Sequence, residues 1–259
     1  MPRVARAKSG TGIYHVIIRG VNRQKIFQDD KDRKRFLQLA AKYKKECGFE
    51  LYAYCLMINH VHLLLREHQE PLAQIMKRIS SSYALWYNKK HERCGHLFQE
   101  RFRSEPVENN DYFLTVLRYI HQNPQKAGFV DSVEGYKWSS YHEYIKEQKD
   151  GMVDTEPAFR LIEGNNKSLE CIRKPFISLH KIITGDDACM EMQEEAGRVS
   201  DEQLRIIIKD RFGLKPEEIQ KERAETQARI LGTLKRNDGT SLRQIARITG
   251  VTVYKVSKA

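Results

Sequence analysis

The sequence is poor in cysteine and contains no long apolar run. Its five cysteines are scattered along the chain, and no two of them form a C-x-x-C pair. This pattern argues against a disulfide framework or a zinc site and is typical of reduced thiols. No apolar stretch approaches the roughly 20 residues that a membrane-spanning helix needs, and residues 1–12 lack the apolar centre of a secretory signal. We therefore expect a soluble cytoplasmic protein.

Positive charge is in clear excess. The 259 residues include 45 Lys and Arg against 34 Asp and Glu, which gives a formal net charge of +11. Such a surplus favours a polyanionic partner, above all nucleic acid, because Lys and Arg displace the counterions that condense on phosphates. A solvated surface or a membrane headgroup partner fits the same charge. The length suffices for one or two domains, each with a buried core.

Apolar periodicity divides the first half of the chain into strands and helices. It predicts strands at residues 12–20, 49–57, 60–67 and 96–107. It predicts helices at residues 29–48, 71–92 and 110–128. The order β-α-β-β-α-β matches the ferredoxin-like pattern, an α+β fold with an antiparallel sheet and packed helices. That fold hosts many functions and selects none of them by itself.

Capping residues indicate where two of these helices begin and end. Either residue of the pair Asp29–Asp30 can cap the first helix, and Gly48 can end it. Asn110 is the expected cap of the third helix, which Pro124 and Gly128 would end.

The composition changes after residue 146. Residues 147–170 are polar with few apolar positions, and the pattern is purely helical from about residue 186. We expect a first domain at residues 1–146, a connector with short helices at residues 147–185, and a helical domain at residues 186–259. Ser200 would cap the first helix of that last domain.

Two histidines stand at the start of the third strand. On a strand, residues i and i+2 share a face, so His60 and His62 present their imidazoles side by side while Val61 and Leu63 face the other way. Two imidazoles on one face suit a divalent metal ion. The simpler alternative is one histidine in a core network and the other exposed to solvent.

The helix at residues 110–128 carries a second pair of polar residues. Tyr119 and Asn123 are four residues apart and therefore share one helical face. A tyrosine hydroxyl can act as a nucleophile, and an amide oxygen can serve as a metal ligand. The alternatives are a core aromatic residue at Tyr119 and a plain helix stop at the Asn-Pro pair.

Three segments in this order resemble the REP-associated tyrosine transposases of the single-tyrosine HUH nuclease superfamily. They are "NHVHLLL", "GHLFQERFRSEPVENNDYFLTVLRYIHQNPQKAGFV" and "YKWSSYHEY". The resemblance extends over residues 13–145. The H-x-H motif alone is common, but its combination with Q-x-R-F and Y-I-x-x-N-P-x-x-A-G is highly specific.

The resemblance implies a set of roles for these residues. His60, His62 and Asn123 would hold Mg²⁺ or Mn²⁺, and Tyr119 would attack a phosphate of single-stranded DNA to form a 5′-phosphotyrosine. Many members of the wider superfamily have glutamine where this chain has Asn123. The family further suggests DNA transposition, hairpin-forming repeats as substrates, and either a monomer or a homodimer. A phenol with a pKa near 10 needs activation at pH 7, and the sequence does not identify the base, since His121 lies on another helical face.

A set of polar residues is expected to contact the DNA backbone. Arginine guanidinium groups suit phosphates because they donate paired hydrogen bonds. Some of these residues alternate on the predicted fourth strand, and the others end the neighbouring strands. The set consists of Arg19, Arg66, Gln99, Arg101 and Arg103. The alternative for each residue is an ordinary solvated surface position.

The end of the chain resembles a helix-turn-helix. Residues 242–250 would form the first helix with Gly250 as the turn, and Thr252 would cap a recognition helix. Such a module could hold duplex DNA, and a generic helical packing domain is the alternative.

Three functions are compatible with these patterns. The first is a metal-dependent DNA endonuclease or transposase with a tyrosine nucleophile. The second is a catalytically silent DNA-binding regulator derived from a transposase. The third is a ferredoxin-like RNA-binding module, although such modules present aromatic residues, not a histidine pair, on the sheet.

Overall fold

The structure, a computed structural model, describes the chain in six segments. They are residues 6–146, 151–163, 169–182, 189, 201–235 and 240–259. The chain divides into two compact units, Met1–Met190 and Glu191–Ala259. The expected domain boundaries at residues 146 and 186 stay predictions. None of the helices among the described residues is both long and apolar enough to cross a membrane.

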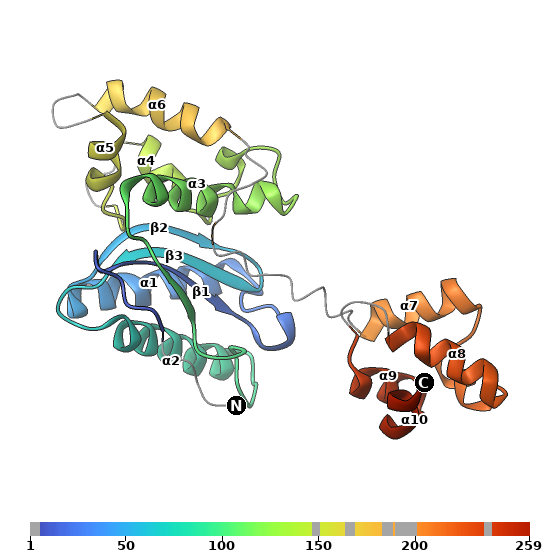
Figure 1. The fold of residues 1–259 in the computed structure, drawn as a ribbon. Helices are drawn as coiled ribbons and strands as arrows, with labels where there is room; N and C mark the ends of the chain where they lie inside the picture. The colour runs from blue at the N-terminus through green and yellow to red at the C-terminus, as the bar shows by residue number, and fades with distance from the viewer. Residues whose placement is uncertain (1–5, 147–150, 164–168, 183–188, 190–200, 236–239) are drawn as a thin grey trace. The chain divides into compact units, whose positions relative to one another are not determined.

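A four-stranded antiparallel sheet forms the centre of the first unit (Figure 1). Its strands are β1 (Ile13–Arg19), β2 (Glu50–Leu56), β3 (His60–Arg66) and β4 (Arg103–Pro106). The spatial order is β2-β3-β1-β4, with β1 paired to both β3 and β4. The predicted α+β class with an antiparallel sheet is confirmed.

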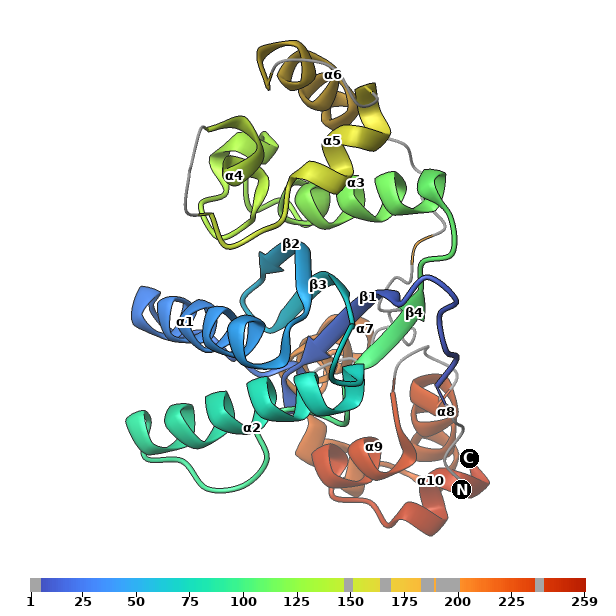
Figure 2. The same ribbon diagram turned by 90° about the vertical axis from the view of Figure 1, so that its left-hand side faces the viewer.

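Helices cover both faces of this sheet, as the two ribbon views show (Figures 1 and 2). One face carries α1 (Asp30–Cys47) and α2 (Leu72–Lys90). The other face carries α3 (Asn110–Lys126) with the shorter helices α4 (Tyr141–Ile145), α5 (Glu156–Glu163) and α6 (Leu169–Lys181). Since both faces are covered, β3 is apolar along its whole length apart from its two histidines and the terminal arginine.

The helix ends follow capping chemistry, with one correction. Asp29 caps α1 in a reciprocal capping box with Asp32, and Gly48 ends the helix at φ 66°, a left-handed conformation that favours glycine. The cap of α3 is Asn109, whose side chain accepts a hydrogen bond from the Tyr112 N–H, and not the expected Asn110. Both positions hold asparagine, so the sequence could not distinguish them.

The predicted end of α3 was also wrong in one detail. Pro124 lies inside the helix, which continues to Lys126 before Gly128 turns the chain at φ 71°.

The fourth strand is much shorter than predicted. Only residues 103–106 pair with β1, whereas the sequence predicted a strand over residues 96–107. The preceding residues contact the end of β1 through single hydrogen bonds, from the Val21 N–H to the Leu97 carbonyl and from the Gln99 N–H to the Arg19 carbonyl. Phe98 forms only an isolated bridge to Gly20. Gln99 and Arg101 therefore lie in a loop and not on a strand.

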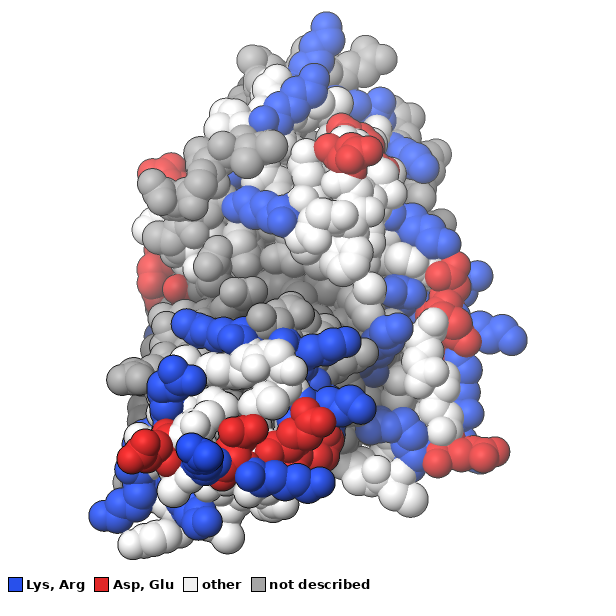
Figure 3. Space-filling model, turned by 90° about the vertical axis from the view of Figure 1, so that its right-hand side faces the viewer, with Lys and Arg blue, Asp and Glu red and all other residues white. Residues whose placement is uncertain are grey.

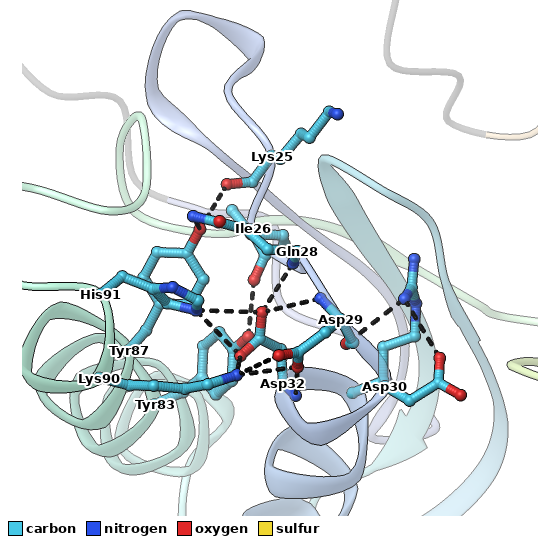
Figure 4. A network of polar contacts seen from close by, with 11 residues as sticks. Lys25, Ile26, Gln28, Asp29, Asp30, Asp32, Tyr83, Tyr87, Lys90 and His91 are labelled. Atoms are coloured by element: carbon cyan, nitrogen blue, oxygen red, sulfur yellow. Dashed lines mark hydrogen bonds and ion pairs between the residues drawn. The ribbon is translucent and has the colours of Figure 1, made fainter.

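A buried carboxylate connects the start of α1 to the end of α2 (Figure 4). The Asp32 side chain is fully buried and accepts hydrogen bonds from the Gln28 N–H at 2.6 Å and from Lys90 Nζ at 2.6 Å. His91 Nε2 lies 3.1 Å from the same carboxylate. Burial opposes the ionisation of Asp32, but these hydrogen bonds outweigh it and hold its pKa below the ordinary value.

The second unit is helical and has its own apolar core. It contains α7 (Asp201–Phe212), α8 (Ala224–Lys235), α9 (Leu242–Thr249) and α10 (Val253–Lys258), with a short 3₁₀ helix at Pro216–Lys221. Two further 3₁₀ turns, Val21–Arg23 and Val133–Gly135, lie in the first unit. Leu204, Ile230, Ile245 and Val256 are buried together. Ser200, the expected cap of α7, lies outside the described residues.

Asp32→Asn should lower the free energy of unfolding by about 3 kcal/mol at pH 7, because it removes the buried negative charge that Lys90 Nζ and the Gln28 N–H contact, and Lys90 keeps only its ion pair with the exposed Asp29. A group whose pKa is lowered by folding stabilises the fold above its unfolded pKa and loses that effect as the pH falls. The difference from wild type should therefore persist above about pH 5 and shrink below about pH 4. Urea unfolding across this pH range checks the prediction, with the exposed Asp131→Asn as control. Equal stability of Asp32→Asn and wild type at pH 7 would contradict it.

Candidate active site

The two predicted histidines lie on β3, a central strand of the sheet. Their ring centroids are 4.9 Å apart, with the planes inclined at 77°. His62 is buried, and His60, at the start of the strand, is half-buried. The side-by-side arrangement predicted from the H-x-H spacing is what the structure shows.

Helix α3 places Tyr119 against this pair. The Tyr119 ring centroid lies 5.7 Å from that of His62 in an edge-on contact, and the tyrosine is only 5% exposed. The structure therefore brings together residues from β3 and α3 that are almost sixty positions apart in the sequence. The Lys126 ammonium lies 5.1 Å from the centroid of the Tyr119 ring and places a positive charge beside the phenol.

Asn123 lies one helical turn beyond Tyr119 and also reaches the histidine pair. Its side chain hydrogen-bonds to His60. His60 Nδ1 lies 2.7 Å from Asn59 Oδ1, which can only accept, so Nδ1 carries the proton. The other ring nitrogen of His60 therefore keeps its lone pair.

A third histidine, which the sequence reasoning missed, completes the cluster. His15 on β1 is fully buried, and its Nε2 lies 3.0 Å from His62 Nδ1. Its ring stacks on that of His62 at 5.3 Å and meets Tyr119 edge-on at 5.8 Å. A histidine in an otherwise apolar strand is the signal that could have indicated it.

All three imidazoles are neutral at pH 7. Burial lowers the pKa of His15 to about 3. Burial and the Arg19 charge lower the pKa of His60 to about 4, against an opposing hydrogen bond to Asn123 that favours the charged form. Burial, with the neighbouring imidazoles, also puts the pKa of His62 well below its ordinary value. Neutral imidazoles can offer lone pairs to a metal ion.

The residues present fit a divalent metal ion. His62 Nε2 is buried and has no hydrogen-bond partner, which is costly for a polar atom unless a ligand satisfies it. His60 lies beside His62, and the Asn123 side chain, which hydrogen-bonds to His60, carries an amide oxygen as a further donor. Among the described residues no group of three or more His, Cys, Asp or Glu side chains forms a metal cage. An ion here would therefore complete its coordination with the amide and with water or a phosphate.

His121 is excluded from this cluster. It is fully buried on another face of α3, as its spacing predicted, and its two ring nitrogens contact His180 at 2.9 Å and Ser140 at 2.8 Å. With both nitrogens engaged there, His121 has no free ring nitrogen to offer to Tyr119.

The structure separates the expected DNA-contacting residues into two groups. Arg19 ends β1 close enough to lower the pKa of His60, and the loop with Gln99 is hydrogen-bonded to the Arg19 backbone. Arg103 begins β4 opposite Ile17. Arg66 lies at the other end of β3, about 20 Å from His60 at the usual rise per residue.

The histidine end of the sheet is therefore bordered by Arg19, Gln99, Arg101 and Arg103. Gln99, Arg101 and Arg103 are exposed there, and Arg66 is exposed at the far end. On the face drawn in Figure 3, Lys and Arg side chains are more widespread than Asp and Glu.

Residues 9–123 match the family described as "Transposase IS200 like". Two curated relatives are similar over part of the chain. The "Putative REP-associated tyrosine transposase" of Haemophilus influenzae is 27% identical over 118 residues, which cover 40% of this chain and 67% of the relative. The "REP-associated tyrosine transposase" of Escherichia coli K12 is 25% identical over 105 residues, which cover 39% of this chain and 59% of the relative.

Solved structures give matches of lower identity. One, "Structure of the REP associates tyrosine transposase bound to a REP hairpin", has 19% identity and a TM-score of 0.49, and the match covers 60% of this chain and 93% of that one. Another, described as a "putative transposase" from Deinococcus radiodurans, has 18% identity and a TM-score of 0.34, and the match covers 50% of this chain and 96% of that one. With the family match, the resemblance to REP-associated tyrosine transposases that the motifs predicted is confirmed.

His62→Ala should weaken Mn²⁺ binding by on the order of 100-fold, because it removes the donor nitrogen that lacks a partner in the protein. Tyr119→Phe should bind Mn²⁺ as tightly as wild type, because the phenol is not among the proposed ligands. Isothermal titration of the DNA-free protein measures both, with the exposed His96→Ala as control. Unchanged affinity in His62→Ala would show that the ion binds elsewhere.

Proposed function

We propose that the chain is a metal-dependent, single-stranded DNA endonuclease and transposase that cleaves and rejoins DNA through Tyr119. The observation that carries the proposal is the position of Tyr119 against the histidine pair of β3, in which His62 Nε2 is buried and has no hydrogen-bond partner. A tyrosine placed only for packing would not need two neutral imidazoles and an amide beside its ring.

The comparisons support the transposase role. Residues 9–123, which include both histidines, the tyrosine and Asn123, are the residues that match the IS200-like transposases. The curated relatives that are similar to part of this chain carry the same kind of name.

The chemistry is a transesterification in which Tyr119 is the nucleophile. Its oxygen forms a bond to the phosphorus of one phosphodiester, the bond from phosphorus to the 3′ oxygen breaks, and that oxygen leaves as a 3′-hydroxyl after taking up a proton. The product is a 5′-phosphotyrosine. Because the number of phosphoester bonds is unchanged, attack by another 3′-hydroxyl reverses the step and rejoins DNA without ATP.

His60, His62 and Asn123 would hold the metal ion. Mg²⁺ or Mn²⁺ bound there would polarise the phosphate and stabilise its developing negative charge. The residues themselves have further roles: the neutral histidines keep their lone pairs available, and Lys126 places a positive charge beside the phenol. The edge-on contact between Tyr119 and His62 fixes the direction of the phenol ring.

Hairpin-forming DNA is the substrate that the site fits best. One solved relative is described as bound to a REP hairpin. In this chain, Arg19, Gln99, Arg101 and Arg103 border the histidine end of the sheet, where their side chains can contact phosphates of a strand that enters the site. Arg66 would contact DNA only if the bound segment extends along the sheet.

Incubation of labelled, single-stranded hairpin DNA with Mn²⁺ should give a slowly migrating, protease-sensitive adduct on a denaturing gel. Tyr119→Phe should abolish the adduct because it lacks the nucleophilic oxygen, and EDTA or His60→Ala should abolish it by removing the metal. The matched control Tyr43→Phe, on the opposite side of the sheet, should form the adduct as wild type does. An adduct in Tyr119→Phe would disprove the assignment of the nucleophile.

The alternative function, a silent DNA-binding regulator, predicts a different result on the same gel. Such a protein would retain hairpin DNA in a native gel without forming any adduct, whatever the metal. A preference for RNA over DNA in the native gel would point instead to the RNA-binding module.

We also propose that the second unit contacts duplex DNA. Gly250, at φ 71°, turns the chain between α9 and α10, and the Thr252 side chain caps α10 by accepting from the Lys255 N–H. Val256 faces the core, whereas Tyr254 is 71% exposed. This two-helix arrangement presents an aromatic and basic surface of the kind that enters a groove of DNA.

The double variant Tyr254→Ala/Lys255→Ala should weaken binding to duplex DNA while it leaves adduct formation on hairpin DNA intact, because the two changes are in the second unit. Fluorescence anisotropy with a labelled duplex measures the first effect, and the denaturing gel the second. Lys42→Ala, an exposed lysine on α1, is the control. Undiminished duplex binding by the double variant would place the duplex contact elsewhere.

A further inference from the structure

A chain of polar side chains runs behind His62, on the side away from His60. It begins at Tyr112 in the first turn of α3, passes through Glu105 on β4 and His15 on β1, and ends at His62 on β3. Its members therefore come from three adjacent strands of the sheet and from the helix that carries Tyr119.

The distances define the order of contacts. The Tyr112 hydroxyl donates to Glu105 Oε2 at 2.6 Å. The same oxygen lies 4.0 Å from His15 Nδ1, and the register places His15 directly opposite Glu105 across β1 and β4. His15 Nε2 lies 3.0 Å from His62 Nδ1, which is the only polar contact of either ring that is within hydrogen-bond distance among the described residues.

The hydrogen bond between the two neutral imidazoles can run in either direction. In the first, His62 Nδ1–H donates to His15 Nε2, so that His62 Nε2 keeps its lone pair and His15 Nδ1 carries a proton toward the Glu105 carboxylate. In the second, His15 donates to His62, and His62 Nε2 becomes a buried donor with no acceptor. The second arrangement also leaves the lone pair of His15 Nδ1 facing a carboxylate. The first arrangement is therefore favoured both at His62 Nε2 and at His15 Nδ1.

We propose that His15 is a positioning residue that accepts the Nδ1 proton of His62 and so fixes the tautomer in which His62 Nε2 can bind a metal ion. The Glu105 carboxylate lies 4.0 Å from His15 Nδ1, so its negative charge favours the tautomer of His15 with a proton on that nitrogen, and Tyr112 connects Glu105 to the helix that carries Tyr119. The inference rests on the proposed function, because it assigns a role to His15 through the metal site of that function. A hydrogen bond to the second nitrogen of a ligating histidine is the usual way in which proteins orient the ring.

Packing alone does not account for a histidine at this position. The neighbouring residues of β1, Val16 and Ile17, are apolar and buried, and His15 itself is fully buried. Burying an imidazole costs free energy that a phenylalanine or leucine of similar size would not cost. The histidine is therefore explained by the hydrogen bond between its Nε2 and His62 Nδ1.

The test compares two substitutions of nearly equal size. In His15→Gln, the amide oxygen can take the place of Nε2 and accept from His62, whereas His15→Phe fills the space without an acceptor. The His15→Phe variant should bind Mn²⁺ about 10- to 100-fold more weakly than wild type, and His15→Gln should restore most of the affinity. Titration calorimetry of the DNA-free full chain measures both, with Tyr14→Phe, the preceding residue of β1, as control.

A second measurement reads the tautomer directly. In a ¹⁵N-histidine-labelled protein without metal, the ring nitrogen shifts of His62, assigned by comparison with His62→Gln, should show a protonated Nδ1 in wild type. In His15→Phe they should move toward the Nε2–H form. The midpoint temperature of thermal unfolding of His15→Phe should be no lower than that of wild type. This result would exclude misfolding as the cause of weaker Mn²⁺ binding.

The outcomes separate this inference from the proposed function. Equal Mn²⁺ affinity in His15→Phe and wild type, or an Nε2–H tautomer of His62 in wild type, would overturn the role of His15 while the metal site stands. Failure of the wild-type protein to bind Mn²⁺ would overturn the metal site itself, and with it this role.

Discussion

The contact between α3 and the β2–β3 half of the sheet is the one on which the candidate site depends. Phe113, Val116, Leu117 and Ile120 are buried on this helix, and the apolar area that they remove from water sets its position. Tyr119 shares that buried environment, so its place over His62 follows from the packing of a whole helix and not from a flexible side chain. A site that joins a strand to a helix in this way is as rigid as the core beneath it.

A second layer of helices packs against α3 on the side that faces away from the sheet. His121 is bonded to both His180 on α6 and Ser140 next to α4, and the Gln122 amide donates to the His180 carbonyl at 2.9 Å. Burial keeps the pKa of His121 well below its ordinary value and lowers the pKa of His180 to about 4, so this cluster is neutral at physiological pH. His121 and Gln122 follow Tyr119 closely in sequence, yet their contacts serve the position of the helix.

Local patterns in the sequence predicted the parts of the site that depend on spacing within one element. The i, i+2 relation placed His60 and His62 on one face, and the i, i+4 relation did the same for Tyr119 and Asn123. His15 and Glu105 were missed because their relation to His62 depends on the register of β1 with both of its neighbours, which no local pattern contains. The fourth strand was overpredicted for a related reason, since its regular pairing with β1 ends at Arg103 and resumes only as the isolated bridge between Phe98 and Gly20, out of the earlier register.

The small exposure of Tyr119 has a consequence for the energetics of substrate choice. If its oxygen attacks a phosphate, that phosphate must come within bonding distance of a side chain that is only 5% exposed. The flexible backbone of a single strand can bring a phosphate to such a recessed side chain more easily than a rigid duplex can, and opening the duplex costs a few kcal/mol. The local melting free energy of the DNA would then set the cleavage rate, so that supercoiling, temperature and base composition next to a hairpin stem would regulate the reaction without any contact to the protein.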